Sequence, residues 1–347
     1  MDEPISLAEF EAVARASLDP GAVAYYAGGA ADEITLVDNV AAWRRLAIRP
    51  RVLVGVEQRD PGVMLLGRRR PHPLVIAPMA LHGLAHPDGE VATARAAAAT
   101  GSVLCVSTFA SQPARAVADA VPDSVRWFQL YVFKDRGVSR ELVEQARENG
   151  YEALVVTVDL PVRGARERES RAPVASDLGH VPATMTAAEF TKLIDSSLTW
   201  KDIELFAAES RLPVLVKGVL TADDARLAAA HGVRGVIVSN HGGRQLDTVL
   251  SGADALPEVA EAVGDEVDVL VDGGIRRGTD VLKALALGAR AVLVGRPVLW
   301  GLAVGGAEGA QRVLEILLSE FDTALALAGT ARADELEAST VTRAPWA

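Results

Sequence analysis

The chain has 347 residues, of which 50% are hydrophobic and 23% are charged, and its formal net charge at pH 7 is −11. This composition excludes a disordered chain, and the negative charge argues against a general nucleic-acid-binding surface. The single cysteine, Cys105, excludes a disulfide framework and a zinc cluster held by several thiolates.

The N-terminal segment carries no sign of export. Its opening residues, MDEPISLAEF, are acidic and lack the basic start and apolar run of a secretory signal peptide. The chain has no stretch of about 18 uncharged apolar residues, so we expect no membrane-spanning helix and a cytoplasmic location. Residues 1–70 are predicted to form a helical and irregular lead-in.

From residue 74 onward, short apolar runs alternate with longer stretches of helical pattern. Each run is rich in Val, Leu and Ile and too short for a buried helix, which predicts strands buried on both faces. The eight predicted strands are 74–77, 103–106, 127–131, 153–158, 214–216, 235–238, 267–271 and 291–294. Four of the stretches between them each end immediately before a glycine, which is a typical helix end, and cover 89–100, 138–149, 222–231 and 279–287.

This alternation predicts a parallel sheet with right-handed crossovers. An open, doubly wound sheet would share the pattern, but eight units favour closure into a (β/α)8 barrel. Residues 74–327 fit the usual barrel length of roughly 250 residues. The lead-in is then free to cover the bottom of the barrel. The connection over residues 162–198, after the fourth strand, lacks periodicity until Ala187, and its length is typical of an active-site loop.

Polar and charged side chains follow the strands, at positions that converge on one mouth of a barrel. They include Gln129, Tyr131, Thr157, Asp159, Arg163, Arg166, Lys217, Ser239, His241, Arg244, Asp272, Arg276 and Arg296. Although the protein is acidic overall, one lysine and several arginines are expected at the same mouth of the barrel, which predicts a local anion-binding site.

Two kinds of anion fit these residues. The glycines 273–274 and the Gly295-Arg296 pair match the phosphate site of barrels, where backbone N–H groups approach an anion closely. Arg166 and Arg244, with Tyr131, offer donors that suit a carboxylate.

His241 is the candidate general base. It lies between a buried strand and a Gly-Gly-Arg turn, and Asp159 is expected nearby. A neighbouring carboxylate fixes the tautomer of an imidazole and stabilises its protonated form. The other histidines have no convincing partners and are interpreted as structural or surface residues, and Cys105 as an inert core residue.

Six motifs, in this order, resemble those of the FMN-dependent α-hydroxy acid oxidases and dehydrogenases. They are Tyr25-Tyr26-Ala-Gly-Gly-Ala30, Gln129-Leu-Tyr-Val-Phe133, Thr157-Val-Asp159, Leu215-Val-Lys-Gly218, Ser239-Asn-His-Gly-Gly-Arg-Gln-Leu-Asp247 and Asp272-Gly-Gly-Ile-Arg-Arg-Gly-Thr-Asp280. Six ordered motifs are far more specific than one glycine-rich match. The resemblance covers nearly the whole chain and implies FMN as cofactor, no metal, and a single FMN-binding domain over residues 1–347. The pattern is most similar to the 4-hydroxymandelate oxidases of glycopeptide-antibiotic pathways.

The resemblance also implies a role for each site residue. His241 takes a proton from the substrate with Asp159 behind it, Tyr131 contacts the α-hydroxyl, and Lys217 sits beside the flavin. The substrate carboxylate is expected on Tyr25, Arg166 and Arg244. Flavin contacts are implied for Ala77, Pro78, Met79, Ala80, Ser107, Gln129, Thr157 and Ser239, a ribityl contact for Asp272, and phosphate contacts for Gly273, Gly274, Arg276, Gly295 and Arg296.

Two departures from the family pattern bear on the reaction. Phe109 stands where glycolate-oxidising relatives carry Trp, which leaves room for a larger substrate. Ala80 stands where the similar monooxygenase branch carries glycine, which favours simple oxidase chemistry. The resemblance therefore predicts oxidation of an (S)-2-hydroxy acid, mandelate or 4-hydroxymandelate, to the 2-oxo acid, with O2 reduced to H2O2.

Other functions remain open from the sequence. The substrate can instead be a small aliphatic acid such as lactate or glycolate, or the electron acceptor can differ from O2. From a different class, a Schiff-base lyase would use Lys217 as nucleophile, and a flavin isomerase or a non-catalytic anion-binding barrel would share the fold. The expected partners are a small 2-hydroxy acid and O2, with no nucleic acid or membrane, and the resemblance suggests a homo-oligomer, a tetramer or an octamer.

Overall fold

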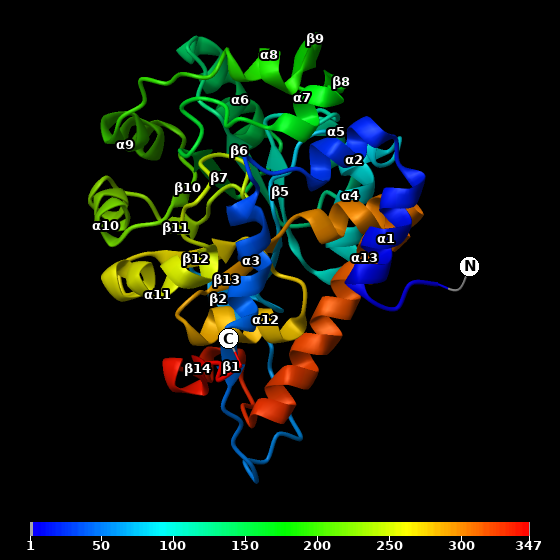
Figure 1. Cartoon of the computed structure of the whole chain (residues 1–347). Coiled ribbons are helices and arrows are strands. Elements are labelled where there is room, and N and C mark those ends of the chain that lie inside the picture. The colour runs from blue at the N-terminus through cyan, green and yellow to red at the C-terminus, as the bar shows by residue number, and fades with distance from the viewer. Residues whose placement is uncertain (1–2, 347) are drawn as a thin grey trace.

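The centre of the molecule is a closed barrel of eight parallel strands (Figure 1). The structure is a computed structural model that describes residues 3–346, and side chains for all of these except 175–177, 181–185 and 187. Around the barrel the strands run in the order β10-β11-β12-β13-β4-β5-β6-β7. Their bounds are β4 Leu74–Ile76, β5 Val103–Ser107, β6 Arg126–Leu130, β7 Ala153–Thr157, β10 Val214–Val219, β11 Gly235–Val238, β12 Asp268–Asp272 and β13 Ala291–Val294. The predicted (β/α)8 barrel is confirmed, and β13 closes it by pairing with β4.

Helices surround the barrel on its outer side. They are α4 Gly89–Thr100, α5 Ala114–Ala120, α6 Arg136–Glu148, α9 Trp200–Glu209, α10 Ala222–Ala230, α11 Gly252–Val263, α12 Gly278–Ala286 and α13 Arg296–Ala328. The four helices predicted from the sequence correspond to α4, α6, α10 and α12. The long α13 is interrupted at Gly305 and Gly306, whose backbone angles are not helical. Among the described residues, no helix is long and apolar enough to cross a membrane.

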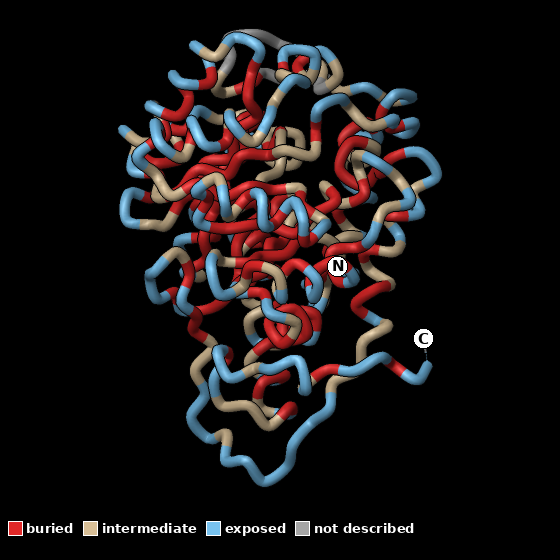
Figure 2. Tube along the Cα trace, turned by 90° about the vertical axis from the view of Figure 1, so that its left-hand side faces the viewer, coloured by how far each residue is buried: buried red, intermediate tan, exposed pale blue. Residues whose placement is uncertain are grey.

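The two faces of each barrel strand enter different parts of the core. One set of alternating residues, including Val75, Cys105 and Leu270, packs in a cluster of its own, and the intervening residues pack against the surrounding helices. Because successive side chains of a strand point to opposite faces, the first set fills the barrel interior. The strands accordingly form the buried centre of the chain trace (Figure 2).

The lead-in only partly follows the expectation that it covers the barrel bottom. The hairpin of β2 (Val63–Leu65) and β3 (Arg68–Arg70) does so, since Leu65 belongs to the interior cluster. The helices α1 (Leu7–Ser17), α2 (Pro20–Ala27) and α3 (Ile34–Arg44) do not, and α1 packs against α13 instead (Figure 1). Both α2 and α3 contact the loops that follow the barrel strands, at the opposite end, as described below. For these three helices the expectation was wrong.

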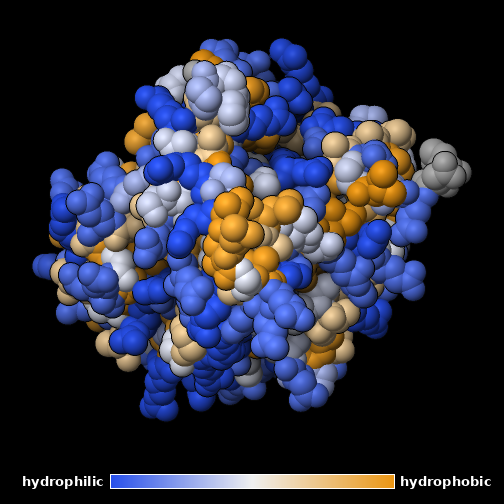
Figure 3. Space-filling model, turned by 90° about the horizontal axis from the view of Figure 1, so that it is seen from below, coloured by the Kyte–Doolittle hydropathy of each residue, from blue (hydrophilic) through white to orange (hydrophobic). Residues whose placement is uncertain are grey.

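The lead-in and the C-terminal segment are joined to each other. Strand β1 (Leu46–Ile48) pairs antiparallel with β14 (Val341–Arg343), and the short 3-10 turns η2 (Ala333–Glu335) and η3 (Ala338–Thr340) precede β14. The loop after β1 projects at the lower end of Figure 1 and exposes Val52 and Leu53 by 82% and 102%. It therefore lies nearest the viewer in Figure 3, where apolar side chains gather near the centre of this face.

The connection over residues 162–198 contains short regular elements. A short helix, α7 (Glu167–Arg171), is followed by a hairpin of β8 (Ala175–Leu178) and β9 (Val181–Thr186) and by a second short helix, α8 (Ala187–Thr191). These elements lie at the end of the barrel where α2 also lies (Figure 1). The absence of periodicity in the sequence reflects elements of only four to six residues each, which are too short to show a repeat.

Candidate active site

A large cavity opens at the carboxyl ends of the barrel strands. It contains about 1100 Å³ of empty space, part of it open to solvent, which is ample for a cofactor and a small substrate. Its walls come from α2, from the ends of β5, β7, β10, β12 and β13, and from the segments that follow the barrel strands. The predicted residues that line it are Tyr25, Ala77, Pro78, Met79, Ala80, Ser107, Tyr131, Thr157, Arg166, Lys217, His241, Arg244, Asp272, Gly273, Gly274, Arg276, Gly295 and Arg296.

The floor of this cavity is the uppermost layer of the barrel interior. Because side chains of a strand alternate between its two faces, the residue two positions after the last apolar inward-facing side chain also faces inward. These positions hold Ala77, Ser107, Gln129, Thr157, Lys217, Ser239, Asp272 and Gly295. Every one of them is small or polar, whereas the layers below are mainly apolar. The barrel therefore ends in a polar floor that a planar ligand can cover.

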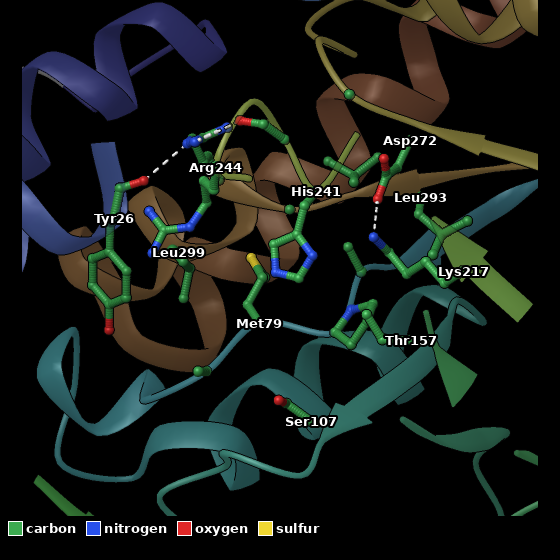
Figure 4. A pocket seen from close by; sticks show the side chains of 18 of the residues that line it. Tyr26, Met79, Ser107, Thr157, Lys217, His241, Arg244, Asp272, Leu293 and Leu299 are labelled. Carbon is green, nitrogen blue, oxygen red and sulfur yellow. Dashed lines mark hydrogen bonds and ion pairs between the residues drawn. The ribbon is translucent and has the colours of Figure 1, made fainter. Parts of the chain in front are cut away.

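Lys217 lies at the centre of this floor. Its Nζ donates to Ser239 Oγ at 2.7 Å and is 2.8 Å from Asp272 Oδ2 (Figure 4). Burial alone would lower the pKa of Lys217, but Asp272 and Asp159 outweigh it and hold the pKa above the usual value. The floor thus carries a fixed positive charge at neutral pH.

Two residues of the floor layer, Gln129 and Ser239, do not reach the cavity surface, and neither does Asp159; these three predicted site residues orient those that line the cavity. Gln129 Nε2 donates to Thr157 Oγ1 at 3.0 Å, while its Oε1 accepts from Ser107 Oγ at 3.2 Å. Ser239 Oγ accepts from the His241 backbone N–H as well as from Lys217. Asp159, the third, contacts the ring of His241.

His241 points into the cavity with its Nε2 atom (Figure 4). Its Nδ1 lies 2.8 Å from Asp159 Oδ1, and burial would raise the pKa of Asp159, yet His241 and Lys217 hold that pKa below its usual range. Since an ionised carboxylate only accepts, Nδ1 carries the proton and Nε2 is left as the acceptor. Nε2 lies 3.3 Å from the Tyr131 hydroxyl, which donates to it. The arrangement is that of a general base with its orienting carboxylate.

The backbone at His241 is unusual. His241 has a φ of 60°, and the two glycines after it continue in the left-handed region at 67° and 74°. A non-glycine residue in this region is held there by its surroundings. Here α3 supplies the restraint: Asn39 and Asn240 exchange two amide hydrogen bonds, at 2.8 and 2.9 Å, and the Asn240 Oδ1 also accepts from the Gly243 N–H.

Two guanidinium groups face the same part of the cavity as His241. Arg166 is 6% exposed and is anchored by hydrogen bonds to the Arg244 carbonyl and to Gln245 Oε1. Arg244 donates to the carbonyls of Tyr25 and Gly28 at the end of α2, and its Cζ lies 5.0 Å from the centre of the Tyr25 ring. Burial and the Arg244 charge lower the pKa of Arg166 to about 10, and Glu169 opposes them.

A second cationic region lies beyond β12 and β13. Arg296 donates to the carbonyls of Tyr26, Gly28 and Gly242, and Arg276 donates to the Ile275 carbonyl. Among the described residues neither guanidinium has a carboxylate within 4.0 Å. Burial and the nearby arginines lower the pKa of Arg296 to about 9, and burial lowers the pKa of Arg276.

The backbone beside these arginines approaches other chain segments closely. Gly274 has a φ of 81°, and a Cβ there would lie 1.8 Å from the Asn39 carbonyl oxygen. Only glycine fits, because both the left-handed backbone and the close approach exclude a side chain. Two cations without a carboxylate partner and a glycine turn are an arrangement that can hold an anion.

The remaining cavity wall near Tyr131 is apolar and aromatic. The Phe109 ring centre lies 4.7 Å from that of Tyr131 and 4.1 Å from that of Phe190, which belongs to α8. Leu160 and Thr191 also line the cavity. The connection over residues 162–198 therefore contributes directly to the wall, through Arg166 and through Thr191 of α8.

Several residues of the site were missed by the sequence analysis. The lining residues in this group are Tyr26, Leu160, Thr191, Gly242, Ile275, Leu293, Val294 and Leu299. Leu293, like Asp272, follows from the two-residue period of a strand, which was available in the sequence. Asn39 and Glu169 had no local signal, since a lone Asn in a helix and an acidic residue in the run ERESR are both typical of a solvated surface.

Comparisons with known proteins agree with this geometry. The family model described as FMN-dependent dehydrogenase matches residues 14–343. The chain is similar to the L-lactate oxidase of Nostoc sp. (44% identity, covering 98% of each chain) and to 2-Hydroxyacid oxidase 2 of Homo sapiens (43% identity, 97% of this chain and 98% of that one). A solved structure of a mandelate oxidase variant with (S)-mandelic acid superimposes with a TM-score of 0.90 at 40% identity, covering 98% of both chains.

Proposed function

The chain belongs to the FMN-dependent dehydrogenase family, and from this premise we propose that it oxidises (S)-mandelate or 4-hydroxymandelate to the corresponding 2-oxo acid with O2 as electron acceptor. FMN is its cofactor, and it is an oxidoreductase that acts on the CH–OH group of 2-hydroxy acids. The substrate loses two electrons and two protons as its C–OH becomes C=O. O2 takes up two electrons and two protons and becomes H2O2.

The residues at the cavity fit FMN. The polar floor around Lys217 suits the polar edge of a flavin ring, and Asp272 Oδ1, which has no hydrogen-bond partner among the described atoms, suits a ribityl hydroxyl. Arg276, Arg296 and the glycines 273–274 would hold the phosphate. Bound FMN supplies the two-electron acceptor for the substrate.

Substrate binding is assigned to the two guanidinium groups and to Tyr25. Arg166 Nη1 and Arg244 Nη2 are not engaged by the hydrogen bonds that anchor the two side chains, and both lie 3.6 Å from the same Glu169 oxygen. A planar carboxylate can take one donor from each, which fixes its orientation. The α-carbon of the substrate is then placed beside His241 and Tyr131.

Proton transfer is assigned to His241 Nε2, and the contact between His241 and Asp159 is the observation that carries the proposed chemistry. It leaves Nε2 without a proton and ready to take one from the substrate. The Tyr131 hydroxyl, 3.3 Å from Nε2, can hydrogen-bond to the substrate oxygen. Burial raises the pKa of Tyr131, so its hydroxyl stays a donor throughout the working pH range.

The aryl substrate is supported by the apolar and aromatic part of the cavity wall. Phe109, Tyr131 and Leu160 offer apolar and aromatic surface, against which a phenyl ring can pack. A substrate without a side chain, such as glycolate, would leave this surface exposed to water. Lactate would cover little of it.

The lyase alternative has less support. A nucleophilic lysine needs an unprotonated amine, which a lowered pKa provides. The pKa of Lys217 is raised instead, because its ammonium group is paired with Asp272.

The proposal is tested by the visible spectrum of the purified holoprotein under anaerobic conditions. (S)-Mandelate should bleach the flavin bands, and admission of air should restore them with one H2O2 per substrate oxidised. Bleaching by lactate or glycolate at a higher kcat/KM than by mandelate would reject the aryl substrate while keeping the reaction. Bleaching that air does not reverse would reject O2 as the acceptor.

A further inference from the structure

Three arginines at the substrate end share a single buried carboxylate, that of Glu169. Glu169 is 5% exposed and belongs to α7. Its Oε1 lies 2.7 Å from Arg163 Nη2, and its Oε2 lies 3.6 Å from both Arg166 Nη1 and Arg244 Nη2. Glu169 does not line the cavity, whereas Arg166 and Arg244 do.

The position of Oε2 is the informative detail. It is buried and has no hydrogen-bond partner among the described atoms, although two guanidinium groups lie just outside bonding distance. A buried carboxylate oxygen without a bond is costly unless nearby charges compensate for the loss of water. The compensation comes from the charges of the two arginines, and neither Arg166 Nη1 nor Arg244 Nη2 is engaged by this oxygen in a hydrogen bond.

Like charges also explain why a carboxylate is needed here. Arg163, Arg166 and Arg244 would repel one another in a site with little water to screen them. The two arginines of the cavity are anchored by carbonyl groups and by Gln245, which are neutral acceptors. Glu169 is the only carboxylate within 4.0 Å of any of the three among the described residues.

We propose that Glu169 is a positioning residue for substrate binding: its negative charge offsets the mutual repulsion of the Arg166 and Arg244 guanidinium groups and holds them side by side, while their donors stay free for the substrate carboxylate. The inference rests on the proposed function, since it assumes that these two arginines bind a carboxylate. Glu169 acts through them and touches no reacting atom.

The consequence is a dependence of substrate binding on alkaline pH. Arg166 is the group concerned, because burial and the charge of Arg244 lower its pKa to about 10. The charged or titratable groups that face it are Arg163 and Glu169 from the segment after β7, Arg244 and His241 from the loop after β11, Tyr25 from α2 and Tyr131 after β6. Removing the Glu169 charge removes the contribution that raises the pKa of Arg166, so this arginine should lose its proton at lower pH.

The test compares Glu169→Gln with Glu167→Gln in the FMN-loaded protein. Glu167 lies on the same helix, is 67% exposed and contacts only Arg171 among the described ion pairs, so the control removes the same charge from the same helix. The ligands are phenylacetate, a carboxylate that cannot be oxidised at an α-hydroxyl, and phenylacetamide, its neutral analogue. Their dissociation constants are measured from the flavin spectrum across the pH range.

In Glu169→Gln, phenylacetate binding should weaken at lower pH than in the wild type, with a loss of about tenfold in affinity near pH ~9.5, where one charge-assisted hydrogen bond is lost. Near neutral pH the affinity should fall by less than about threefold, since Arg166 is charged in both proteins. Phenylacetamide binding should be unchanged at every pH. A merely structural role for Glu169 would instead weaken both ligands across the whole range, and that outcome overturns the proposal.

If Glu169→Gln does not fold, a second variant tests the same electrostatic effect on Arg166. Arg163→Met removes a positive charge that lowers the pKa of Arg166, so the alkaline loss of phenylacetate binding should move to higher pH. Movement to lower pH, or none, contradicts the proposal. Glu169→Asp, which keeps the charge, should restore much of the alkaline binding.

The same experiment separates this inference from the proposed function. A wild-type protein that binds phenylacetate no better than phenylacetamide, and whose flavin mandelate does not reduce, rejects the proposed function. A wild type that behaves as proposed, with Glu169→Gln indistinguishable from it at every pH, rejects only the role of Glu169.

Discussion

The Nδ1 atom of His241 lies 2.8 Å from Oδ1 of Asp159, and this contact determines which nitrogen of the ring faces the cavity. The backbone of His241 is held in the left-handed region by the loop after β11, which two hydrogen bonds between Asn240 and Asn39 attach to α3. Both restraints act on one side chain, so the direction of Nε2 is fixed before any substrate enters. Such preorganisation is what a general base requires.

Replacing His241 with alanine should abolish reduction of the flavin by substrate and leave FMN bound. The loss in the rate of flavin reduction should be about 10³-fold or more, since positioned general bases contribute roughly 10²–10⁴. Anaerobic stopped-flow spectra measure it directly. His231→Ala is the matched control, because His231 caps α10 on the outside of the barrel. Near-normal flavin reduction in His241→Ala would reject the assignment of the base.

The pH profile of kcat/KM should have its acidic limb below pH ~6.5. Burial lowers the pKa of His241 from its usual value of 6.5, with Asp159 opposing. The neutral imidazole is the active form, so activity rises as pH increases through this lowered pKa and is full at neutral pH.

Asp159→Asn should move that acidic limb to still lower pH, because the carboxylate that favours the protonated ring is gone. The plateau should also fall, by roughly 10²–10⁴, because the charge that stabilises the protonated base is lost. Steady-state rates from pH ~4 to pH ~8 measure both effects. A limb that moves to higher pH would contradict the described electrostatics.

The phosphate end of the cofactor site is tested by comparing two neighbouring arginines. Arg276→Ala should weaken FMN binding by about 10- to 100-fold, since it removes a charge-assisted hydrogen bond worth roughly 1.5–3 kcal/mol. Arg277→Ala should not, because Arg277 is largely exposed and pairs with Glu320. Ultrafiltration followed by absorbance of the released flavin gives the dissociation constants. Equal FMN loss from the two variants would place the phosphate elsewhere.

The aromatic wall is tested with Phe109→Trp. The larger indole should occupy the space proposed for the phenyl ring, because Phe109 already packs against Tyr131 and Phe190 and cannot retreat. The kcat/KM for (S)-mandelate should fall by about tenfold or more, and that for lactate should hold or rise, as expected for a misfit in a packed apolar pocket. An equal fall for both acids would show damage to the site and not a change in specificity.

The fold and most of the candidate site could be predicted from the sequence, because in a closed barrel the local apolar pattern of each strand also determines where the residues after it lie. The eight strands were predicted from their apolar runs, and residues just after them converge on one mouth wherever the strands close. Lys217 and Asp272 needed only the two-residue period of a strand to be placed side by side on the floor. Fold and floor were therefore accessible from short windows of sequence.

The parts that were missed depend on contacts between distant segments. Helices α2 and α3 could have been placed at either end of the barrel, and what places them at the mouth is a handful of hydrogen bonds such as those of Asn39 with Asn240 and of Trp43 Nε1 with the Gly273 carbonyl. Glu169 lies in a short charged run that would be solvated on an ordinary surface. Its burial against arginines from two loops is visible only in three dimensions.

The closure of the barrel sets an order of events during synthesis of the chain. β4 can pair with β5 early, but residues 74–76 find their second partner only when residues 292–294 of β13 have been made. Helix α2 likewise gains its contacts with Arg244 and Arg296 only when those late segments exist. A ribosome releases the N-terminal part of this site long before its other half exists. The flavin pocket is consequently among the last features of the molecule to form, and a nascent chain that stops short of β13 exposes the apolar edges of β4 and β12 with no cofactor to cover the floor.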